Sequence, residues 1–330
     1  MYYIGIDLGG TNIAAGIVDE DGQIIYKESI PTQKKRNQQE IMEDMAKLSQ
    51  RLLEEAGIKL QDLQSIGVGS PGSPDLKEGI IIYNNNLGFR NAPIRKVIQK
   101  QIPVPVYLNN DANCAALAEG LLGAAGGVKY SVTITLGTGI GGGIILNNEI
   151  YSGFNNAGAE LGHMVILSDG RECTCGRKGC WEAYASATAL IELAQEAASK
   201  NHDSLLFTLV NGELTQITAK TPFDAVKQGD PIANKVVQEY IGYLAEGVSN
   251  IINIFQPEIL VVGGGVSKQG DYLLNLLQER VNQEIYSKEE IPKTKLRTAL
   301  LGNDAGIIGA ALLGFAPKQL SRLVKKDKKP

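Results

Sequence analysis

Short apolar runs alternate along this chain with glycine-rich turns and with stretches of helical periodicity. At the start, residues 2–8, 13–18 and 23–30 predict three strands joined by tight turns, because apolar runs bounded by Gly, Asn and Asp are typical of hairpins. Asp7 closes the first strand. The turn after it consists of Gly9, Gly10, Thr11 and Asn12.

Further strands and helices follow in alternation. Apolar positions recur at helical spacing between residues 37 and 56, and Gly57 is placed as a stop. The loop SPGSP at 70–74, which contains Gly72, reads as an irregular, solvent-facing turn. The other predicted strands cover 65–69, 79–83, 104–108, 130–136, 144–146, 258–262 and 295–301, and the other helices cover 92–100, 112–122, 231–255 and 305–315. This alternation indicates an α/β fold.

One motif, a strand followed by a glycine turn and a second strand, occurs twice along the chain. Strand 130–136 turns through Gly137, Thr138 and Gly139 into a second strand, and a shift of 128 positions aligns this turn with the first one. Glycine lets the backbone approach a phosphate closely, and threonine adds a hydroxyl donor. The repeat predicts a duplicated domain holding a polyphosphate between its copies, with two unrelated glycine hairpins as the alternative.

A third glycine run follows the predicted strand 258–262. It consists of Gly263, Gly264 and Gly265 and precedes another helix. A strand, glycine loop and helix in this order suit the nucleoside end of a ligand. An ordinary tight turn has the same pattern, so both interpretations stay open.

Length and charge narrow the class of protein. A chain of 330 residues is long for one hydrophobic core, so we expect two lobes around a cleft. A formal charge of -4 and a pI near 5.5 argue against a nucleic-acid or anionic-membrane surface. The chain begins directly in a strand with no leader pattern, and no apolar stretch reaches membrane-spanning length. These features, with clustered thiols, predict a cytoplasmic protein.

Three of the four cysteines and one of the two histidines lie close together in sequence. His163, Cys173, Cys175 and Cys180 form a complete tetrahedral ligand set for a structural zinc, since no position is left for water. A reduced cysteine cluster or a disulfide is the alternative. Glu160 and Glu182 flank this set. The remaining Cys114 fits the apolar face of a helix and reads as a core residue.

Asp111 lies where the strand 104–108 ends and the helix 112–122 begins. Asn110 or Asp111 suits an N-cap, since both residue types favour that position. A carboxylate at a strand end in such a fold is also suited to accept a proton from a substrate hydroxyl. The sequence leaves both roles open.

Taken together, these motifs resemble the ROK family of bacterial sugar kinases and related repressors over residues 2–316. The matching segments are DLGGT at 7–11, LNNDAN at 108–113, LGTGIGGG at 136–143, ELGH at 160–163, CTCGRKGCWE at 173–182 and VVGGG at 261–265. The resemblance implies an actin-like, hexokinase-type ATPase fold, also called ribonuclease H-like. It further implies a small lobe of 1–110 plus 305–316 and a large lobe of 111–304 with the zinc loop 163–180. The residues after Pro317 carry six basic side chains against one acidic one and predict a basic flexible tail at 317–330.

The resemblance also implies roles for individual residues. Asp111 is the general base that activates a sugar hydroxyl toward the γ-phosphate of ATP. The sugar ligands are Gly72, Asn110, Glu160, His163 and Glu182. Phosphate contacts come from Gly9, Gly10, Thr11, Asn12, Gly137, Thr138 and Gly139, Asp7 organises Mg²⁺, and Gly263, Gly264 and Gly265 lie by the nucleoside.

The expected function is ATP-dependent phosphorylation of glucose to glucose 6-phosphate, a glycolytic reaction. Fructose, mannose and N-acetylhexosamines are alternative acceptors, and polyphosphate is an alternative donor. A sugar-sensing repressor is disfavoured because residues before Asp7 leave no room for a helix-turn-helix, and a non-catalytic sugar-binding protein is disfavoured by the intact Asp111. The resemblance implies a homodimer or homotetramer.

Overall fold

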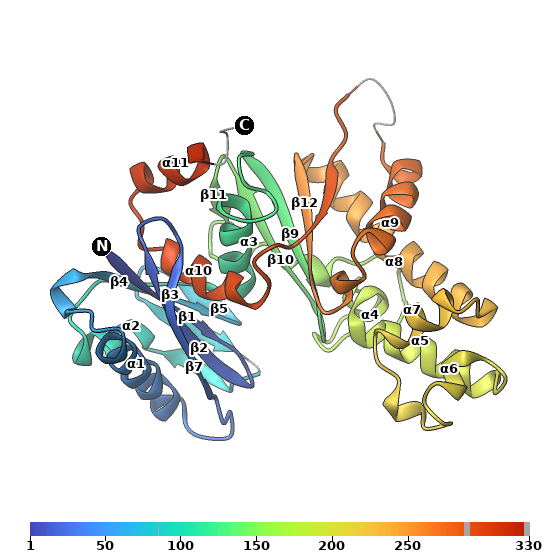
Figure 1. Cartoon of the computed structure of the whole chain (residues 1–330), viewed down its shortest axis with the longest axis horizontal. Helices are drawn as coiled ribbons and strands as arrows, with labels where there is room; N and C mark the ends of the chain where they lie inside the picture. Colours follow the sequence, from blue (N-terminus) through green and yellow to red (C-terminus); the bar gives the residue numbers. More distant parts are fainter. Residues whose placement is uncertain (85, 287–290, 327–330) are drawn as a thin grey trace. The chain divides into compact units, whose positions relative to one another are not determined.

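A computed structural model describes residues 1–84, 86–286 and 291–326 of the chain, with side chains up to residue 323 (Figure 1). The chain divides into two compact units. The first comprises Met1–Thr133, Gly143–Ala159 and the described part of Leu300–Pro330, and the second comprises Ile134–Gly142 and the described part of Glu160–Ala299. In this division residues 111–133 belong to the first unit. From the sequence we expect the large lobe to begin at residue 111, so the two boundaries differ.

The first unit contains a five-stranded sheet in the order β3-β2-β1-β4-β8. The strands are β1 (Tyr2–Leu8), β2 (Asn12–Asp19), β3 (Ile24–Pro31), β4 (Leu63–Ser70) and β8 (Val106–Asn110). β2 pairs antiparallel with β1 and β3, whereas β4 pairs parallel with β1 and β8. The three strands expected at the start are confirmed, and the later parallel strands need the crossover connections that follow.

Two helices in these crossovers cover the sheet with apolar faces. α1 (Gln38–Glu55) begins with a capping box, in which Asn37 Oδ1 accepts from the Glu40 backbone N–H at 3.0 Å. Its buried residues and those of α2 (Ile94–Gln101) join the strands in one hydrophobic core. The predicted helical periodicity is therefore confirmed.

Beyond β4 the chain departs from the expected solvent-facing loop. Ser73–Asp75 form strand β5, which pairs with β6 (Ile80–Asn84), and β6 pairs with β7 (Phe89–Ala92). Ser70 and Pro74 are buried. The prediction of an exposed, irregular turn is wrong here because the small sheet pairs and covers this segment. Asn85 lies outside the described residues.

Helix α10 (Ala305–Leu312) packs unusually close to its neighbours in the first unit. A Cβ atom added to Gly5 or Gly67 would lie 1.8 or 1.7 Å from a carbonyl oxygen of α10, and one added to Gly309 would lie 1.7 Å from a carbonyl oxygen of α3 (Asp111–Leu121). Backbone therefore packs on backbone, which only glycine permits at these positions. These contacts fix β1, β4 and α3 around α10.

A buried carboxylate adds a second tie to α3. The Glu119 side chain is 1% exposed and accepts hydrogen bonds from three backbone N–H groups, those of Ala124, Leu300 and Leu301, at 2.8, 3.2 and 2.8 Å. Buried charge requires such partners. Glu119 thus holds the segment that leads into α10.

A second five-stranded sheet has the order β11-β10-β9-β12-β13. The strands are β9 (Tyr130–Leu136), β10 (Ile140–Leu146), β11 (Glu149–Tyr151), β12 (Ile259–Gly264) and β13 (Lys295–Thr298). As in the first sheet, the earliest strand is central, its two successors lie on one side, and two later strands lie on the other. This shared order supports the predicted duplication.

The second unit also carries most of the helices. They are α4 (Glu182–Ala185), α5 (Ala187–Lys200), α6 (Leu205–Thr208), α7 (Thr221–Lys227), α8 (Pro231–Phe255) and α9 (Asp271–Glu284). α8 has the bounds that its periodicity predicts. It starts at the cap Asp230, whose Oδ1 accepts from the backbone N–H groups of Ile232 and Ala233.

Residues 317–326 belong to the expected flexible tail but form helix α11 (Pro317–Lys326). Leu323 is buried in a cluster with Phe315 and Tyr3, and Gln319 donates to the Tyr3 hydroxyl at 2.7 Å. An amphipathic pattern thus anchors this segment. Residues 327–330 of the expected tail lie outside the described part of the chain.

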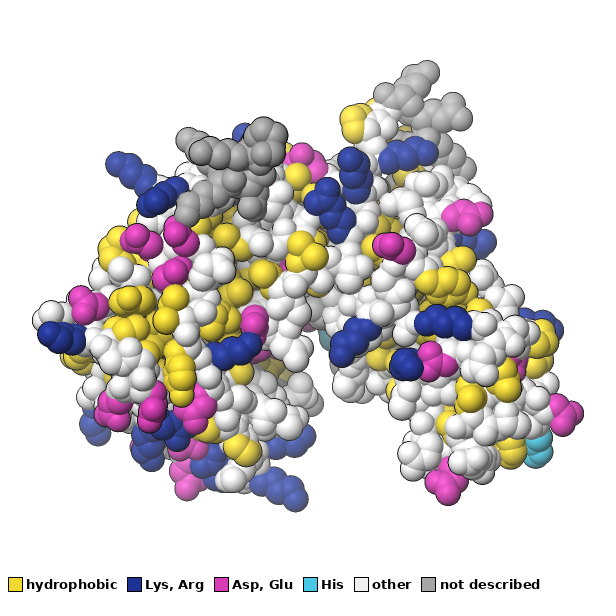
Figure 2. Space-filling model, viewed as in Figure 1, with side chains coloured by type: hydrophobic (Ala, Val, Ile, Leu, Met, Phe, Trp, Pro, Cys, Tyr) yellow, Lys and Arg dark blue, Asp and Glu magenta, His cyan; other side chains and the backbone are white. Residues whose placement is uncertain are grey.

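The described residues contain no membrane-spanning helix, and the face drawn in Figure 2 shows no strong charge bias. Within the described residues, no helix has both the length and the apolar character that crossing a membrane requires. On the face drawn in Figure 2, acidic and basic side chains are interspersed. An interspersed surface of this kind does not favour binding to a polyanion.

Candidate active site

Two carboxylates lie at neighbouring strand ends of the first sheet. The register places Asp7 of β1 opposite Gly69 of β4, and Gly69 opposite Asn109 of β8, two residues before Asp111. Carboxyl ends of parallel strands share one edge of a sheet, which is where ligands bind in open α/β folds. Asp7 and Asp111 therefore belong to one edge.

Burial shifts the acidity of both groups. Burial, and then the charge of Asp111, raise the pKa of Asp7 from 3.8 to about 6. Burial also raises the pKa of Asp111, although a hydrogen bond from the Ala112 backbone N–H opposes the shift. A carboxylate with a raised pKa is a stronger base than an exposed aspartate.

Asn110 resolves the question of the helix cap. Its Oδ1 accepts from the backbone N–H groups of Ala112 at 2.9 Å and Asn113 at 3.3 Å, so Asn110 is the N-cap of α3. Asp111 is the first helical residue. The capping role that the sequence leaves open for both thus falls to Asn110, and the Asp111 carboxylate is available for chemistry.

The loop at 70–74 is held against this cap. Asn110 Nδ2 donates to the Gly72 carbonyl at 3.4 Å. Gly72 has φ of +99°, and a Cβ there would lie 2.3 Å from the Tyr83 carbonyl oxygen, so glycine is required. Asn84 is buried and donates from Nδ2 to the Pro71 carbonyl. Sequence reasoning missed Asn84, because asparagine runs are typical of ordinary turns.

The first glycine turn, residues 9–12, is tied down from one side and open on the other. The Gly9 backbone N–H donates to the Asn12 carbonyl at 2.9 Å, and the Thr32 hydroxyl donates to the Gly9 carbonyl at 2.7 Å. A Cβ at Gly10 would contact nothing, and the Thr11 side chain is exposed. The turn can therefore admit a phosphate.

The second glycine turn, residues 137–140, has a similar open side. The Gly137 backbone N–H donates to the Gly139 carbonyl at 3.0 Å, a Cβ at Gly137 would contact nothing, and Thr138 is exposed. On its other side Gly139 packs on Glu182, whose Oε2 would lie 2.0 Å from an added Cβ. A larger residue at position 139 would therefore have to displace the Glu182 carboxylate.

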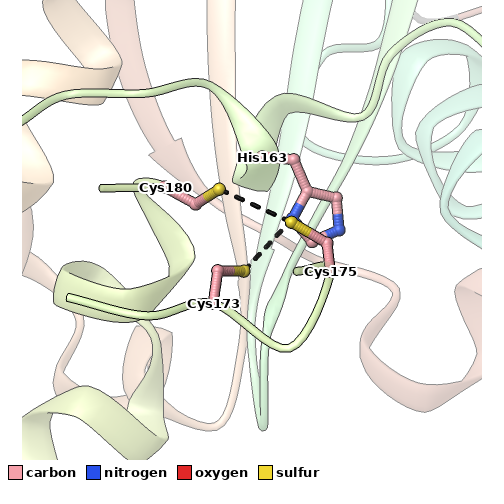
Figure 3. Close-up of side chains that lie close together, drawn as sticks. All are labelled: His163, Cys173, Cys175 and Cys180. Atoms are coloured by element: carbon pink, nitrogen blue, oxygen red, sulfur yellow. Dashed lines mark hydrogen bonds between the residues drawn. The ribbon is translucent and has the colours of Figure 1, made fainter. Parts of the chain in front are cut away.

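The four predicted metal ligands converge in the second unit (Figure 3). His163 ends the 3-10 turn Leu161–His163, and the cysteines lie in the loop that follows. Their ligand atoms lie within 4.8 Å of one another. Gly176 and Gly179 have φ of +88° and +79°, which lets this loop close.

The distances within this group suit zinc. Cys175 Sγ lies 3.7 Å from Cys180 Sγ, and Cys173 Sγ lies 3.6 Å from His163 Nδ1. A tetrahedral zinc separates two sulfurs by about 3.8 Å and a sulfur from a nitrogen by about 3.6 Å. The cysteines are free, so the disulfide alternative is wrong. The His163 tautomer is set by whichever ring nitrogen binds the metal.

Of the flanking acids, Glu182 is the first residue of α4 and Glu160 precedes the His163 turn. Glu182 Oε2 accepts from the Ile140 backbone N–H at 2.8 Å, and its Oε1 lies 3.9 Å from Cys173 Sγ. Glu160 is exposed. The structure thus brings Glu182 to the second glycine turn, a contact that sequence spacing does not reveal.

The third glycine run includes a position that needs glycine for its turn. Gly264 has φ of +85°, and a Cβ there would lie 2.4 Å from the Leu136 carbonyl oxygen. The Ser267 hydroxyl donates to the Gly264 carbonyl at 2.8 Å. This supports the tight-turn interpretation for Gly264. Gly265 has open space, so a ligand role there stays a prediction.

The predicted site residues thus form one group in each unit. The first unit holds Asp7, Gly9, Gly10, Thr11, Asn12, Gly72, Asn110 and Asp111, and the second holds Gly137, Thr138, Gly139, Glu160, His163, Cys173, Cys175, Cys180, Glu182, Gly263, Gly264 and Gly265. Each group combines a glycine turn with polar side chains.

Kinases of known activity resemble this chain over nearly its whole length. The glucokinase of Thermotoga maritima is 37% identical over 309 residues, 93% of this chain and 95% of that protein. The glucokinase of Halalkalibacterium halodurans is 36% identical over 327 residues, 98% and 97% of the two chains. A solved ROK family glucokinase from Streptomyces griseus in complex with glucose and AMPPNP is 34% identical, with a TM-score of 0.80 over 95% of this chain and 99% of that chain.

Repressors are more distant relatives. The xylose repressor of Caldicellulosiruptor bescii is 29% identical over 315 residues, which are 94% of this chain and 78% of the repressor. The model of the ROK family matches residues 3–316. Because this match covers nearly the whole chain and the glucokinase relatives exceed 30% identity, the chain belongs to the ROK family.

Proposed function

We propose that this protein is an ATP-dependent hexose kinase that phosphorylates glucose at its 6-hydroxyl. The observation that carries the proposal is Asp111, a carboxylate of raised pKa at a ligand-binding sheet edge, freed from capping by Asn110. The glucokinase relatives supply the substrate class. ATP as donor also implies a cytoplasmic location.

In the proposed step Asp111 takes the proton from the sugar O6 as that oxygen attacks the γ-phosphorus. The O6–P bond forms while the bond from the γ-phosphorus to the β,γ-bridging oxygen breaks, and ADP leaves with that electron pair. The products are glucose 6-phosphate and ADP, with the proton on Asp111. Asp7 would help to hold Mg²⁺, and the metal would neutralise charge on the phosphates.

Free hydrogen-bonding capacity supports the predicted sugar ligands. Asn110 Oδ1 serves the helix cap, so its Nδ2 is the group available to a hydroxyl, beside the Gly72 carbonyl. Glu182 Oε2 accepts from the Ile140 N–H, and its Oε1 accepts from the Cys173 thiol at 3.9 Å. Once Cys173 bound zinc as a thiolate, Oε1 would be open to a sugar hydroxyl. Because His163 Nδ1 faces Cys173, Nε2 carries the proton and donates to the sugar when Nδ1 binds zinc. Glu160 is proposed as a further sugar ligand on the family resemblance alone.

Phosphates are proposed to bind the open sides of both glycine turns. Their backbone N–H groups and the hydroxyls of Thr11 and Thr138 are donors suited to phosphate oxygens. The group at Gly263, Gly264 and Gly265 is proposed to lie by the nucleoside, with Gly265 as its open position. The zinc ligands serve a structural ion that holds the His163 ring in place.

A coupled assay of ADP formation with Mg²⁺ and ATP tests the proposal. The acceptors are glucose, mannose, fructose, N-acetylglucosamine and N-acetylmannosamine, and kcat/KM is compared between them, with polyphosphate as a second donor. We expect the highest kcat/KM with glucose and ATP. A preference for another sugar keeps the kinase and changes its substrate, whereas no turnover with any acceptor overturns the proposal.

The repressor alternative rests on the more distant relatives. A repressor requires DNA affinity that responds to sugar, and an acidic chain with interspersed surface charge is poorly suited to a polyanion. A gel-shift titration with random duplex DNA separates the two functions. We expect no binding at 0.1 M salt. A homodimer or homotetramer remains a prediction, and light scattering of the purified protein tests it.

A further inference from the structure

The segment Glu182–Thr188 contacts the second glycine turn at both of its ends. It joins the last zinc-loop residues to helix α5. Three hydrogen bonds run between them: Ile140 N–H to Glu182 Oε2 at 2.8 Å, Ala187 N–H to the Gly137 carbonyl at 2.9 Å, and the Thr188 hydroxyl to the Thr138 carbonyl at 2.9 Å. Each residue of the turn except Gly139 is therefore bonded to this segment.

Close steric contacts also join the second glycine turn to residues on either side of the zinc loop. A Cβ at Gly139 would lie 2.0 Å from Glu182 Oε2, and a Cβ at Gly162 would lie 2.3 Å from the Ile140 carbonyl oxygen. Gly162 directly precedes the zinc ligand His163. The turn is thus seated between the two ends of the zinc loop, and its shape depends on them.

We infer that Glu182 and Thr188 are positioning residues for the nucleotide, because they fix the turn that receives its phosphates. The inference rests on the proposed function, which assigns Glu182 to the sugar and gives Thr188 no role. Preorganised N–H donors bind an oxyanion more tightly than donors that must first be ordered. Loosening the turn therefore weakens nucleotide binding even where every phosphate donor is retained.

Thr188 gives the cleaner test, because its hydroxyl contacts only the turn among the hydrogen bonds described. Isothermal titration of AMPPNP with Mg²⁺, without sugar, measures nucleotide affinity. We expect Thr188→Val to weaken it by about two- to tenfold, the worth of one hydrogen bond, and Thr188→Ser to restore it. Glucose affinity of Thr188→Val should equal that of the wild type.

The matched control is Thr208→Val. Thr208 also donates its hydroxyl to a carbonyl, that of Ser204, but in helix α6 away from the turn. This variant loses the same kind of bond and should bind AMPPNP as the wild type does. If Thr188→Val and Thr208→Val bind AMPPNP with wild-type affinity, the inference is overturned.

Glu182 provides the stronger perturbation. We expect Glu182→Ala to weaken AMPPNP binding by about ten- to a hundredfold, since a charge-assisted bond is lost, and Glu182→Gln, which keeps an acceptor for Ile140, to weaken it less. Zinc content by elemental analysis shows whether the loop stays intact. If Glu182→Ala loses zinc, its weaker binding reports the damaged loop, and the AMPPNP affinity of Thr188→Val alone tests the inference.

The binding readout separates this inference from the proposed function. A wild-type protein that binds AMPPNP but phosphorylates no sugar contradicts the kinase proposal, while the variants still test the positioning role. A wild-type protein that does not bind AMPPNP overturns the inference itself.

Discussion

The buried carboxylates of Asp111 and Asp7 are costly to folding when they are ionised. Its pKa is raised in the folded state above the ordinary value, and so is that of Asp7. For such a group the favourable contribution is complete below the unfolded pKa and is lost as pH rises through the folded pKa. At neutral pH the two carboxylates therefore destabilise the fold.

Asp111→Asn should accordingly raise the melting temperature. The amide keeps an acceptor for the Ala112 N–H and removes a buried charge that also acts on Asp7. We expect the melting temperature to rise by a few °C at pH 8 and by less at pH 5. Differential scanning fluorimetry measures it, with Asp62→Asn, an exposed site, as the control. A melting temperature that falls at pH 8 contradicts this account.

The raised pKa values also predict the pH dependence of catalysis. The base acts only when deprotonated, and Asp7 binds Mg²⁺ best as a carboxylate, so kcat/KM falls as pH drops. We expect the acidic limb near pH 6, the pKa of Asp7, instead of near the ordinary 3.8. Steady-state rates between pH 5 and 8.5 measure it. Full kcat/KM at pH 5 would contradict the raised pKa of Asp7.

At the residue scale, the sequence identified candidate site residues better than it identified the contacts around them. It selected Asp111 and Asn110, but only the hydrogen bonds of the Asn110 side chain assign the cap to one of them. Asn84 was hidden in an asparagine run, and the bond from Ile140 to Glu182 joins residues 42 positions apart. No local pattern encodes such contacts, because they depend on tertiary packing.

Among the elements, helix α10 depends most on glycine. Gly67→Ala places a methyl group 1.7 Å from a carbonyl oxygen of α10, and neither backbone can yield easily. We expect a loss of about 1–3 kcal/mol or failure to fold. Gly242→Ala in α8, where an added Cβ contacts nothing, should be neutral or stabilising. Urea unfolding compares the two, and equal stabilities would contradict the close packing.

The zinc loop is the second element whose integrity can be tested. We expect one zinc per chain by elemental analysis, because the ligand separations suit a tetrahedral ion. Cys175→Ser should lose the metal and lower the melting temperature by several °C. Cys114→Ala, a change at the cysteine outside the cluster, should keep it. Wild-type protein without zinc after purification in metal-containing medium would contradict the site.

Element prediction succeeded where periodicity was long and failed where elements were short. α8 and β9 have the bounds that the sequence predicts. The strands β5 and β7 were missed because each is short and depends on pairing with β6. Helix α11 was missed because its basic charge concealed the apolar face at Leu320 and Leu323.

At the scale of the whole molecule, duplication was visible in sequence and division into units was not. The two glycine turns, 128 positions apart, correspond to turns after the central strands of two sheets with the same order. The division assigns Tyr130–Thr133 to the first unit and Ile134–Gly142 to the second, so it passes through β9 and β10. Composition does not change at that point, so no linker signal marks it.

The central claim is that Asp111 transfers a proton while phosphate passes from ATP to glucose. The most direct measurement is the rate of glucose 6-phosphate formation by wild type and Asp111→Asn, with glucose affinity measured calorimetrically on both. We predict that kcat falls by about 10² to 10⁴ while glucose affinity stays within a few-fold. Unchanged turnover in Asp111→Asn would show that another group is the base, and the account would be wrong at its centre.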